Sequence, residues 1–391
     1  MKRIEYLIKH NSVIQFLYRH IFSLFFQVLG LFVKKDDKLI IFSSFGGKKF
    51  NDSPKVIFEK MVRMHEFEGF RFVWAFTSPK DYLIEHAEVV KINSLKYFIL
   101  CLKAKVWITS VNIERGLHFK KRGTYYVNTW HGAGTKKIGN ACSGRKDYDF
   151  SDVDLMLVQS DFEKEIFVRD FNCKKENIEI VGFPRNDALF QPSFYHKRND
   201  IKEELSIPDK KRIILYAPTW RDSIDGGISY KIEPPINIDY WRSKLGDKYV
   251  ILFKAHTLIT DTRIQFDDFI FDVSNYGELN NLLSITDILV TDYSTIVYDS
   301  AVARIPFLCF GYDYDKYKEE RGFYYDLNSE YPNGVIKNED DLIEKILEIK
   351  GKKAFSEKYE SFRKKYIQAG GESLDFVVSR VLAFLNNNIL Q

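Results

Sequence analysis

The chain has 391 residues, of which 45% are hydrophobic and 16% aromatic. This length and composition favour two folded domains of similar size and exclude a disordered chain. The net charge of +4 is small, and without a zinc-finger, RNA-binding or basic-helix pattern it argues against a nucleic-acid partner. The four cysteines have no metal-ligand spacing, which favours a reduced, cytosolic compartment.

Residues 13–33, VIQFLYRHIFSLFFQVLGLFV, form an apolar run long enough for a membrane helix, without the small-residue cleavage site of a signal peptide. Polar or small residues recur along this run every three or four positions, which places them on one stripe of a helix. They are Ser12, Gln15, Arg19, Ser23, Gln27, Gly30 and Lys34. A central Arg19 would cost about 2.5–3.5 kcal/mol in a spanning helix, so we expect residues 1–37 to be an amphipathic segment on the membrane surface, with Arg19 among the headgroups.

The N-terminal segment is also the most basic part of the chain. Residues 1–60 contain eleven Lys or Arg and five Asp or Glu, and Lys9, Lys34 and Lys35 flank the apolar run, where they would meet anionic lipid. A helix packed against the protein's own core and a true membrane span remain open alternatives.

From residue 38 onward, short β-rich runs alternate with helical or loop stretches, which is typical of a parallel sheet wound with helices. Strands are predicted at Leu39–Ser43, Phe70–Phe76, Val106–Thr109, Tyr125–Thr129, Leu155–Gln159 and Ile178–Val181. A polar stretch with two prolines, residues 190–211, then interrupts the alternation. We therefore predict a first Rossmann-like domain over residues 38–190.

The alternation restarts after the break and predicts a second Rossmann-like domain over residues 191–391. Its strands are predicted at Ile213–Tyr216, Val250–Phe253, Phe269–Val273, Ile288–Val290 and Phe307–Phe310, and residues 340–388 are predicted to form helices on its outside. Two doubly wound α/β domains in tandem predict a ligand cleft between them, where strand C-termini face each other.

Chemically suggestive residues follow the predicted strands. The stretch NTWHGAGTKKIG, residues 128–139, places His131 directly after a strand and just before two flexible positions, Gly132 and Gly134, which allow a backbone to approach a ligand closely. A neutral imidazole is well suited to accept a proton near pH 7. His131 is therefore the candidate general base.

The stretch LVTDYSTIVYD contains Asp292, Ser294 and Thr295 between a predicted strand and a helix-like run. These residue types are favoured helix caps, and exposed N–H groups and hydroxyls at a helix start can also hold phosphate oxygens. Both interpretations remain open. No Walker lysine motif and no G-x-G-x-x-G pattern occurs, which argues against an ordinary P-loop ATPase or dinucleotide enzyme.

Three further stretches follow strands. In LFKAHTLI, Lys254 and His256 are predicted to point to the same face and to suit a pyrophosphate, although a lone histidine at a strand end is more often structural. In YAPTWRD, Arg221 is a candidate phosphate ligand or a surface ion-pair partner. GFPRND, residues 182–187, indicates by itself only an ordered turn near the domain junction.

In this order, the motifs TWHGAGTKKIG, GFPRND, YAPTWRD, KAH and the run from DVSNYGELNN to RGFYYDL resemble those of the CDP-glycerol glycerophosphotransferase family of teichoic acid and capsule synthesis. The upstream FSSFGGKKFNDSPKVIFEKM also looks like that family, so the resemblance covers residues 39–327. It implies a GT-B type fold and a peripheral enzyme on the cytoplasmic face of the membrane. It also implies transfer of an alditol phosphate, typically glycerol phosphate, from a CDP-activated donor to an undecaprenyl-linked saccharide, with release of CMP.

The resemblance implies roles for individual residues. His131 matches the family's candidate base, and His256 matches a histidine that helps to bind the donor diphosphate. Ser294 and Thr295 match a hydroxyl pair at the donor phosphate, next to Asp292, and Arg321 lies in the matching RGFYYD turn. No carboxylate cluster resembles a metal cage, so neither a metal nor another cofactor is assigned, and CDP-glycerol enters as co-substrate.

Three positions depart from the family pattern. Lys254 stands where arginine is usual and cannot make the two-pronged guanidinium contact. Gly134-Thr135 replaces a threonine-proline pair, and Glu278 replaces an aspartate. The size resembles that of the primase-type members, which add the first or first few units, and single-unit polymerases remain open. Two other functions also remain open: a GT-B glycosyltransferase or epimerase that uses a UDP-sugar, and a non-catalytic membrane scaffold.

Overall fold

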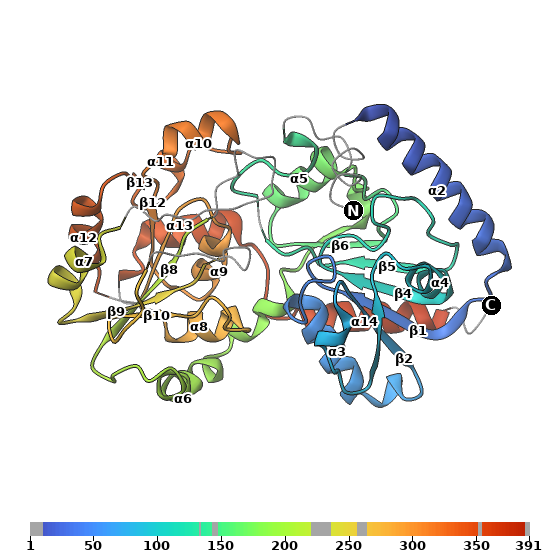
Figure 1. The fold of residues 1–391 in the computed structure, drawn as a ribbon, viewed down its shortest axis with the longest axis horizontal. Helices are drawn as coiled ribbons and strands as arrows, with labels where there is room; N and C mark the ends of the chain where they lie inside the picture. The colour runs from blue at the N-terminus through green and yellow to red at the C-terminus, as the bar shows by residue number, and fades with distance from the viewer. Residues whose placement is uncertain are drawn as a thin grey trace. The chain divides into compact units, whose positions relative to one another are not determined.

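The computed structural model describes residues 11–132, 134–142, 148–219, 236–255, 264–350 and 354–387 (Figure 1). Its contacts divide the chain into two compact units, each with one parallel sheet and its own helices. The first unit contains Met1–His131, Ile138–Asp187 and Gln368–Gln391, and the second contains Gly132–Lys137 and Ala188–Ile367. Each unit is described by itself below.

The first unit has a seven-stranded parallel sheet in the order β3-β2-β1-β4-β5-β6-β7. The strands are β1 (Asp36–Ser43), β2 (Arg71–Phe76), β3 (Ala87–Lys91), β4 (Ala104–Thr109), β5 (Tyr125–Asn128), β6 (Leu155–Val158) and β7 (Ile178–Ile180). The helices of this unit are α2 (Ser12–Phe32), α3 (Asp52–Arg63), α4 (Leu95–Lys103), α5 (Asp161–Phe171) and α14 (Ser373–Asn387). The central strands are buried along their length because helices cover both faces of a parallel sheet.

The second unit has a six-stranded parallel sheet in the order β10-β9-β8-β11-β12-β13. The strands are β8 (Arg212–Ala217), β9 (Tyr249–Phe253), β10 (Ile270–Asp272), β11 (Ile288–Thr291), β12 (Phe307–Phe310) and β13 (Val335–Ile336). The helices are α6 (Arg198–Glu204), α7 (Ile238–Leu245), α8 (Leu279–Ile285), α9 (Ile296–Val302), α10 (Tyr314–Glu320), α11 (Leu327–Glu330), α12 (Glu339–Glu348) and α13 (Glu357–Tyr366). The predicted α/β class with two Rossmann-like units is confirmed.

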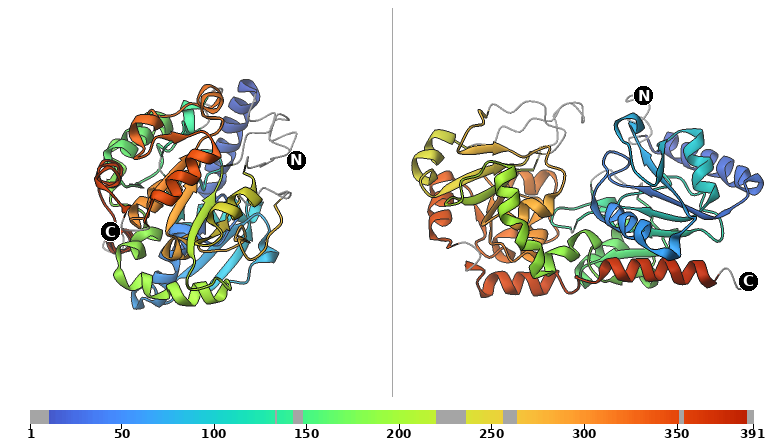
Figure 2. Two further views of the ribbon diagram at one scale, coloured as in Figure 1. Left: turned by 90° about the vertical axis from the view of Figure 1, so that its left-hand side faces the viewer. Right: turned by 90° about the horizontal axis from the view of Figure 1, so that it is seen from below.

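The C-terminal helix corrects one part of the predicted domain division. Residues 368–391 belong to the first unit, although we expected them in the second. The helix α14 packs against α3 and places Val377 and Val381 in the core of the first sheet; it is the red helix nearest the C label in the right-hand view of Figure 2. Asp187 holds its start, because its carboxylate accepts hydrogen bonds from the N–H groups of Gly371 (2.9 Å) and Leu374 (2.7 Å).

The helix α2 forms as predicted, but its polar stripe faces the protein. Three residues of the stripe bind His118: Arg19 donates to Nε2 (2.9 Å), Gln27 donates to the backbone oxygen (2.7 Å), and Oγ of Ser23 accepts from the backbone N–H (2.9 Å). Arg19 also lies 3.7 Å from Asp149. The prediction that Arg19 lies among lipid headgroups is therefore wrong, because its guanidinium is bound to His118 of the same protein.

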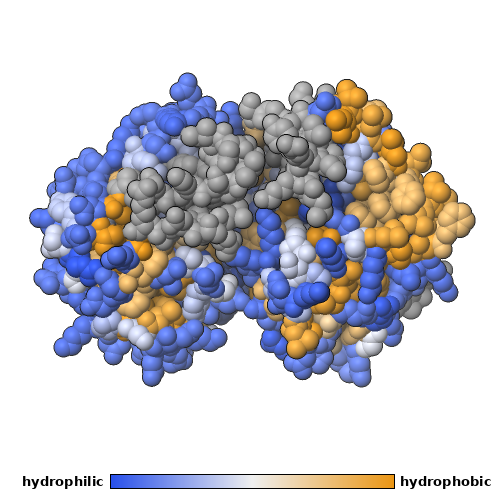
Figure 3. All heavy atoms as spheres, in the orientation of Figure 1, coloured by the Kyte–Doolittle hydropathy of each residue, from blue (hydrophilic) through white to orange (hydrophobic). Residues whose placement is uncertain are grey.

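The opposite face of α2 is apolar and exposed. Its exposed large side chains are Val13, Ile14, Phe16, Leu17, Ile21, Phe22, Leu24, Phe25, Val28, Leu31 and Phe32, which form the hydrophobic surface on the right of Figure 3. By length and composition, Val13–Phe32 could cross a membrane, and only 17% of it is buried. The helix thus presents a continuous apolar stripe outward and is fixed to the first unit through its polar residues.

Candidate active site

His131 lies at the carboxyl edge of the first sheet, three residues beyond β5. The chain turns there because Trp130 adopts a left-handed backbone conformation, with φ of 50°. The side chain of Asn128 supports this turn by accepting a hydrogen bond from the N–H of Trp130 (2.9 Å). In addition, the N–H of Thr129 donates to the carbonyl of Thr109 at the end of β4 (2.8 Å). The imidazole is therefore held by the ends of two neighbouring strands.

The surroundings of His131 fix which of its nitrogens carries the proton. Nδ1 lies 2.6 Å from the carbonyl oxygen of Ser110, and a carbonyl can only accept, so Nδ1 is protonated and Nε2 of the neutral ring keeps its lone pair. The rings of Phe45 and Trp130 lie 5.1 and 4.3 Å from the imidazole centroid. Burial lowers the pKa of His131. These features favour a neutral imidazole with Nε2 available as a proton acceptor.

Two charged residues that the sequence reasoning did not single out form an ion pair in loops at the same carboxyl edge as His131. Nη1 of Arg185 is 3.3 Å from each carboxylate oxygen of Asp52. The charge of Asp52 raises the pKa of His131 and that of Arg185 lowers it, both less strongly than burial does. Asp52 and Arg185 belong to FSSFGGKKFNDSPKV and GFPRND, which carried the family resemblance without a role for either residue. That resemblance was the signal that could have identified them.

The segment that follows His131 belongs to the second unit. It runs beside the RGFYYD turn, with hydrogen bonds from the N–H of Lys137 to Gly322 O (3.1 Å) and from the N–H of Tyr324 to Thr135 O (3.1 Å). Lys136 and Phe323 form an antiparallel bridge between these bonds. The structure thus brings the turn that follows His131 together with the turn that contains Arg321. Gly134 is buried within the same segment.

Gly132 lies against Thr295, the residue before α9. A Cβ added to Gly132 would be 2.7 Å from Oγ1 and 3.2 Å from Cβ of Thr295, closer than carbon and oxygen can pack. The side chain of Thr135 extends the contact with α9, because its hydroxyl donates to the Tyr298 hydroxyl at 3.3 Å. Gly132 and Thr295, predicted as site residues from separate motifs, are therefore in direct contact.

Asp292 and Ser294 support the turn between β11 and α9. Oδ1 of Asp292 accepts hydrogen bonds from the N–H groups of Thr219 (2.8 Å) and Tyr293 (2.7 Å), and the residue is only 3% exposed. Oγ of Ser294 accepts a hydrogen bond from the N–H of Ile296 (3.4 Å). Asp292 therefore fixes the loops after β8 and β11 to each other, and Ser294 binds the first backbone amide of α9, ahead of the N-cap residue Thr295.

Lys254 follows β9 and points towards the backbone of a neighbouring loop. Its Nζ donates to the carbonyl oxygens of Val273 (3.2 Å) and Tyr276 (3.0 Å). The predicted neighbour His256 and the predicted phosphate ligand Arg221 lie outside the described residues. Arg321 is the residue that follows α10, and its backbone N–H donates to the carbonyl of Tyr317 (2.9 Å). Glu278, which departs from the family pattern, precedes α8 as its N-cap residue.

A group of potential metal ligands occurs elsewhere, beneath α2. Ligand atoms of Glu114, His118 and Asp152 lie within 4.8 Å of one another. They already bind protein groups: Nδ1 of His118 donates to Asp152 (2.9 Å), and Glu114 accepts from the N–H groups of Phe119 (2.8 Å) and Lys120 (3.0 Å). This cluster therefore serves to fix the loop that holds α2.

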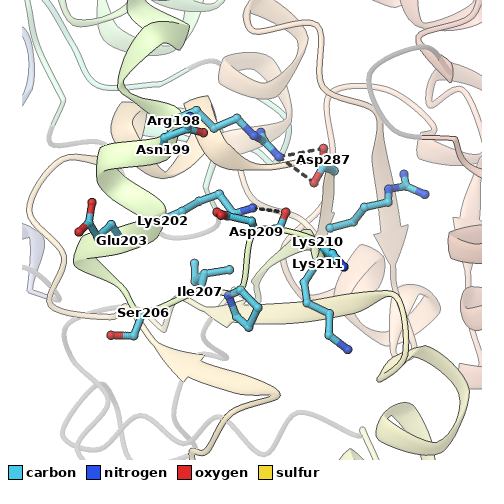
Figure 4. A pocket seen from close by; sticks show the side chains of 12 residues that line it. Arg198, Asn199, Lys202, Glu203, Ser206, Ile207, Asp209, Lys210, Lys211 and Asp287 are labelled. Atoms are coloured by element: carbon cyan, nitrogen blue, oxygen red, sulfur yellow. Dashed lines mark hydrogen bonds and ion pairs between the residues drawn. The ribbon is translucent and has the colours of Figure 1, made fainter.

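A cavity of about 690 Å³ lies beside α6 and the start of β8 (Figure 4). Two of its cations have protein partners: Arg198 pairs with Asp287 (3.0 Å), and Lys202 donates to the carbonyl of Asp209 (2.8 Å). None of the predicted site residues that the structure describes lines it. The cavity lies at the amino end of β8, because Arg212, the first residue of that strand, lines it. The candidate site residues instead follow the carboxyl ends of strands, so the cavity is not part of the candidate site.

Two Rossmann-like units, each with candidate site residues after the strands of a parallel sheet, have the architecture of the GT-B fold. The family model for CDP-Glycerol:Poly(glycerophosphate) glycerophosphotransferase matches residues 24–383. The chain therefore belongs to this family, as its motifs predicted, and is a glycerophosphotransferase-type enzyme.

Individual relatives agree over nearly the whole chain. A teichoic acid glycerol-phosphate transferase of Staphylococcus aureus is 33% identical over 363 residues, which cover 87% of this chain and 90% of the relative. A teichoic acid poly(glycerol phosphate) polymerase of Bacillus spizizenii is 31% identical over 366 residues, 89% and 91% of the two chains. A solved structure of the wall teichoic acid polymerase TagF is 28% identical, with a TM-score of 0.82, and the match covers 97% of this chain and 100% of the solved chain.

Proposed function

We propose that the enzyme transfers glycerol phosphate from CDP-glycerol to a hydroxyl of an undecaprenyl-linked saccharide or polymer and releases CMP. The family supports a CDP-glycerol donor and a teichoic acid type of acceptor. The observation that carries the proposal within this chain is His131, whose Nδ1 is occupied by the Ser110 carbonyl and whose Nε2 keeps its lone pair.

In the proposed reaction, Nε2 of His131 takes the proton from the acceptor hydroxyl. The hydroxyl oxygen attacks the phosphorus that bears glycerol, and a new P–O bond forms. The bond from that phosphorus to the bridging oxygen breaks, and its electron pair leaves with CMP. General base assistance of this kind contributes roughly 10²- to 10⁴-fold, and cations at the leaving phosphate add electrostatic stabilisation.

The donor side is assigned to the second unit. His256, Arg221 and Arg321 are proposed to bind the diphosphate, with the hydroxyls of Ser294 and Thr295 next to it. Lys254 has a different role in this proposal from the direct contact first expected, because its ammonium binds the Val273 and Tyr276 carbonyls. It shapes the loop beside the donor. Asp292 likewise acts by holding two loops together.

The number of glycerol phosphate units that the enzyme adds to its acceptor is open to two proposals. Relatives of this chain include a glycerol-phosphate transferase, a primase and polymerases. The transferase and the primase among the relatives favour addition of a first unit or a few units, and the polymerases favour repeated addition. The number of units added is therefore a direct readout of the assay below.

We further propose that α2 attaches the enzyme to the cytoplasmic face of the membrane without crossing it. The apolar face of α2 is exposed along the helix, and its polar stripe is bound to the first unit. A helix held in this way presents its apolar face sideways to a bilayer surface, as interfacial helices do. Attachment would confine the enzyme to the plane that contains its lipid-linked acceptor.

The experiment is an assay of the full chain with CDP-glycerol, CDP-ribitol and a UDP-sugar, each with a short-chain lipid-linked disaccharide. Mass spectrometry should show an acceptor gain of glycerol phosphate with CDP-glycerol, matched by released CMP. A gain with CDP-ribitol alone would overturn the donor assignment. Release of UDP with a sugar gain would favour the glycosyltransferase alternative, and no gain with any donor would favour the scaffold.

A further inference from the structure

A buried ion pair joins two loops at the carboxyl edge of the first sheet. Asp52 follows the loop after β1 and Arg185 lies in the loop after β7, with side chains only 4% and 12% exposed. The backbone N–H of Arg185 also donates to Oγ of Ser53 (3.3 Å). The Arg185 guanidinium rests on the Phe183 ring, 5.0 Å from its centroid. Both charges are therefore fixed in place by packing.

Stability alone gives little reason for this pair. Removing two charges from water often costs as much as their attraction returns, so a buried pair is weak evidence of a stabilising role. Asp52 in addition has φ of 64°, a left-handed conformation that is unfavourable for residues other than glycine. A buried charge in a strained backbone conformation is typical of functional sites.

The loop that leads to Asp52 contacts the candidate base. Phe45, in the loop that precedes Asp52, contacts the His131 ring, and the carbonyl of Ser110 accepts a hydrogen bond from its Nδ1. Phe45, Trp130 and the Ser110 carbonyl bring no charge to the ring. Within the described residues, the charged groups that act on His131 are Asp52 and Arg185, and their effects are opposite in sign.

We infer that Asp52 and Arg185 are positioning residues of the His131 site: Asp52 stabilises the imidazolium that forms when His131 accepts the proton, and Arg185 offsets the Asp52 charge so that the resting imidazole stays neutral. This inference rests on the proposed function, because it concerns the same proton transfer. Neither residue needs to touch the substrate. The pair acts through space, and its effect depends on both charges being present.

Because the charges of Asp52 and Arg185 are opposite, removing each one should shift the pH dependence of activity in opposite directions. Loss of a purely structural pair would not do so. Transfer of glycerol phosphate by the full chain is measured against pH, and the acid limb of kcat/KM reports the free base. Arg185→Met leaves Asp52 uncompensated, so the acid limb moves to higher pH by roughly half a unit or more, and activity recovers at high pH. Asp52→Asn moves the limb to lower pH and lowers kcat at every pH. The double variant returns the limb towards that of wild type.

Two controls separate charge from folding. Arg185→Lys keeps the charge and leaves the acid limb near its wild-type position. Arg198 and Asp287 form a comparable ion pair at 3.0 Å in the second unit, and Arg198→Met with Asp287→Asn leaves the limb unmoved even if the melting temperature falls. Limbs that stay fixed in Arg185→Met and Asp52→Asn, or that move in the same direction, overturn the inference. Wild-type enzyme without glycerol phosphate transfer at any pH instead refutes the proposed function.

Discussion

Gly132 and Thr295 are in contact, although they come from opposite halves of the sequence, and a Cβ on Gly132 would lie 2.7 Å from Oγ1 of Thr295. This contact ties the turn after His131 to the start of α9. The pairing of Thr135 with Tyr324 and of Lys137 with Gly322 continues the same junction. The backbone that leaves the candidate base is thus fixed within the second unit, where the donor-binding residues are proposed.

The first prediction concerns this contact. Gly132→Ala forces a methyl group into Thr295, which we expect to destabilise the protein by about 1–3 kcal/mol and to lower kcat/KM by up to about 10²-fold through displacement of the turn. Gly277→Ala is the matched control, because nothing lies within 4 Å of a Cβ at that position. Steady-state kinetics and thermal denaturation test both variants. Equal kcat/KM values for Gly132→Ala and Gly277→Ala would contradict the importance of the contact.

The second prediction concerns the exposed face of α2. Leu24 is 61% exposed there, whereas Leu83 is an exposed leucine in the loop between β2 and β3. Burying one leucine in a bilayer contributes about 1.5–3 kcal/mol, so Leu24→Glu should reduce partitioning to anionic vesicles by roughly tenfold or more. Leu83→Glu should leave it unchanged. Co-sedimentation measures the partitioning, and undiminished binding by Leu24→Glu would exclude this face as the attachment site.

The third prediction concerns Glu114 beneath α2. Burial, followed by the charge of Asp152, raises the pKa of Glu114 to about 7 from an ordinary value of 4.5. The folded protein therefore holds this proton more tightly than the unfolded chain, so its contribution to stability is complete below pH 4.5 and is lost as pH rises through about 7. The corresponding loss is of the order of 3 kcal/mol.

Glu114→Gln removes this titration while keeping a side-chain oxygen for the amides of Phe119 and Lys120. Across that pH range, the free energy of unfolding should therefore fall more in wild type than in Glu114→Gln. Glu85→Gln is the control, since that side chain is 88% exposed. Denaturant titrations at a series of pH values provide the measurement. Parallel curves for wild type and Glu114→Gln would show that Glu114 titrates alike in the folded and unfolded states.

The sequence was most informative about buried strands. Runs such as Ile213–Tyr216 and Phe307–Phe310 are apolar throughout because both faces of a parallel sheet are covered, and all eleven predicted strands occur in the sheets. The two strands that were missed lie at sheet edges. Only Val90 of β3 is buried, and β13 has two residues, so neither has the continuous apolar pattern that identifies a buried strand.

The sequence was less informative about the hydrogen-bond or ion-pair partner of each polar side chain. The stripe on α2 was correctly located, but the spacing of Arg19, Ser23 and Gln27 does not indicate whether they face water or the protein. The same limit applies to Lys254. The alternation of side chains along a strand predicted the face of the sheet to which Lys254 points, but its carbonyl partners come from a loop about twenty residues further along the chain. Asp52 and Arg185 meet because β1 and β7 are parallel and both end at the carboxyl edge of the same sheet. Neither local motif contains information about this arrangement of strands.

The most direct measurement of the central claim is mass spectrometry of a lipid-linked acceptor incubated with CDP-glycerol and either wild-type enzyme or His131→Ala. Wild type should add glycerol phosphate and release an equal amount of CMP, and His131→Ala should do so at least about 10²-fold more slowly with an unchanged melting temperature. Transfer by His131→Ala at the wild-type rate would contradict the role of His131 as the general base, and no glycerol phosphate on the acceptor with wild type would contradict the reaction itself.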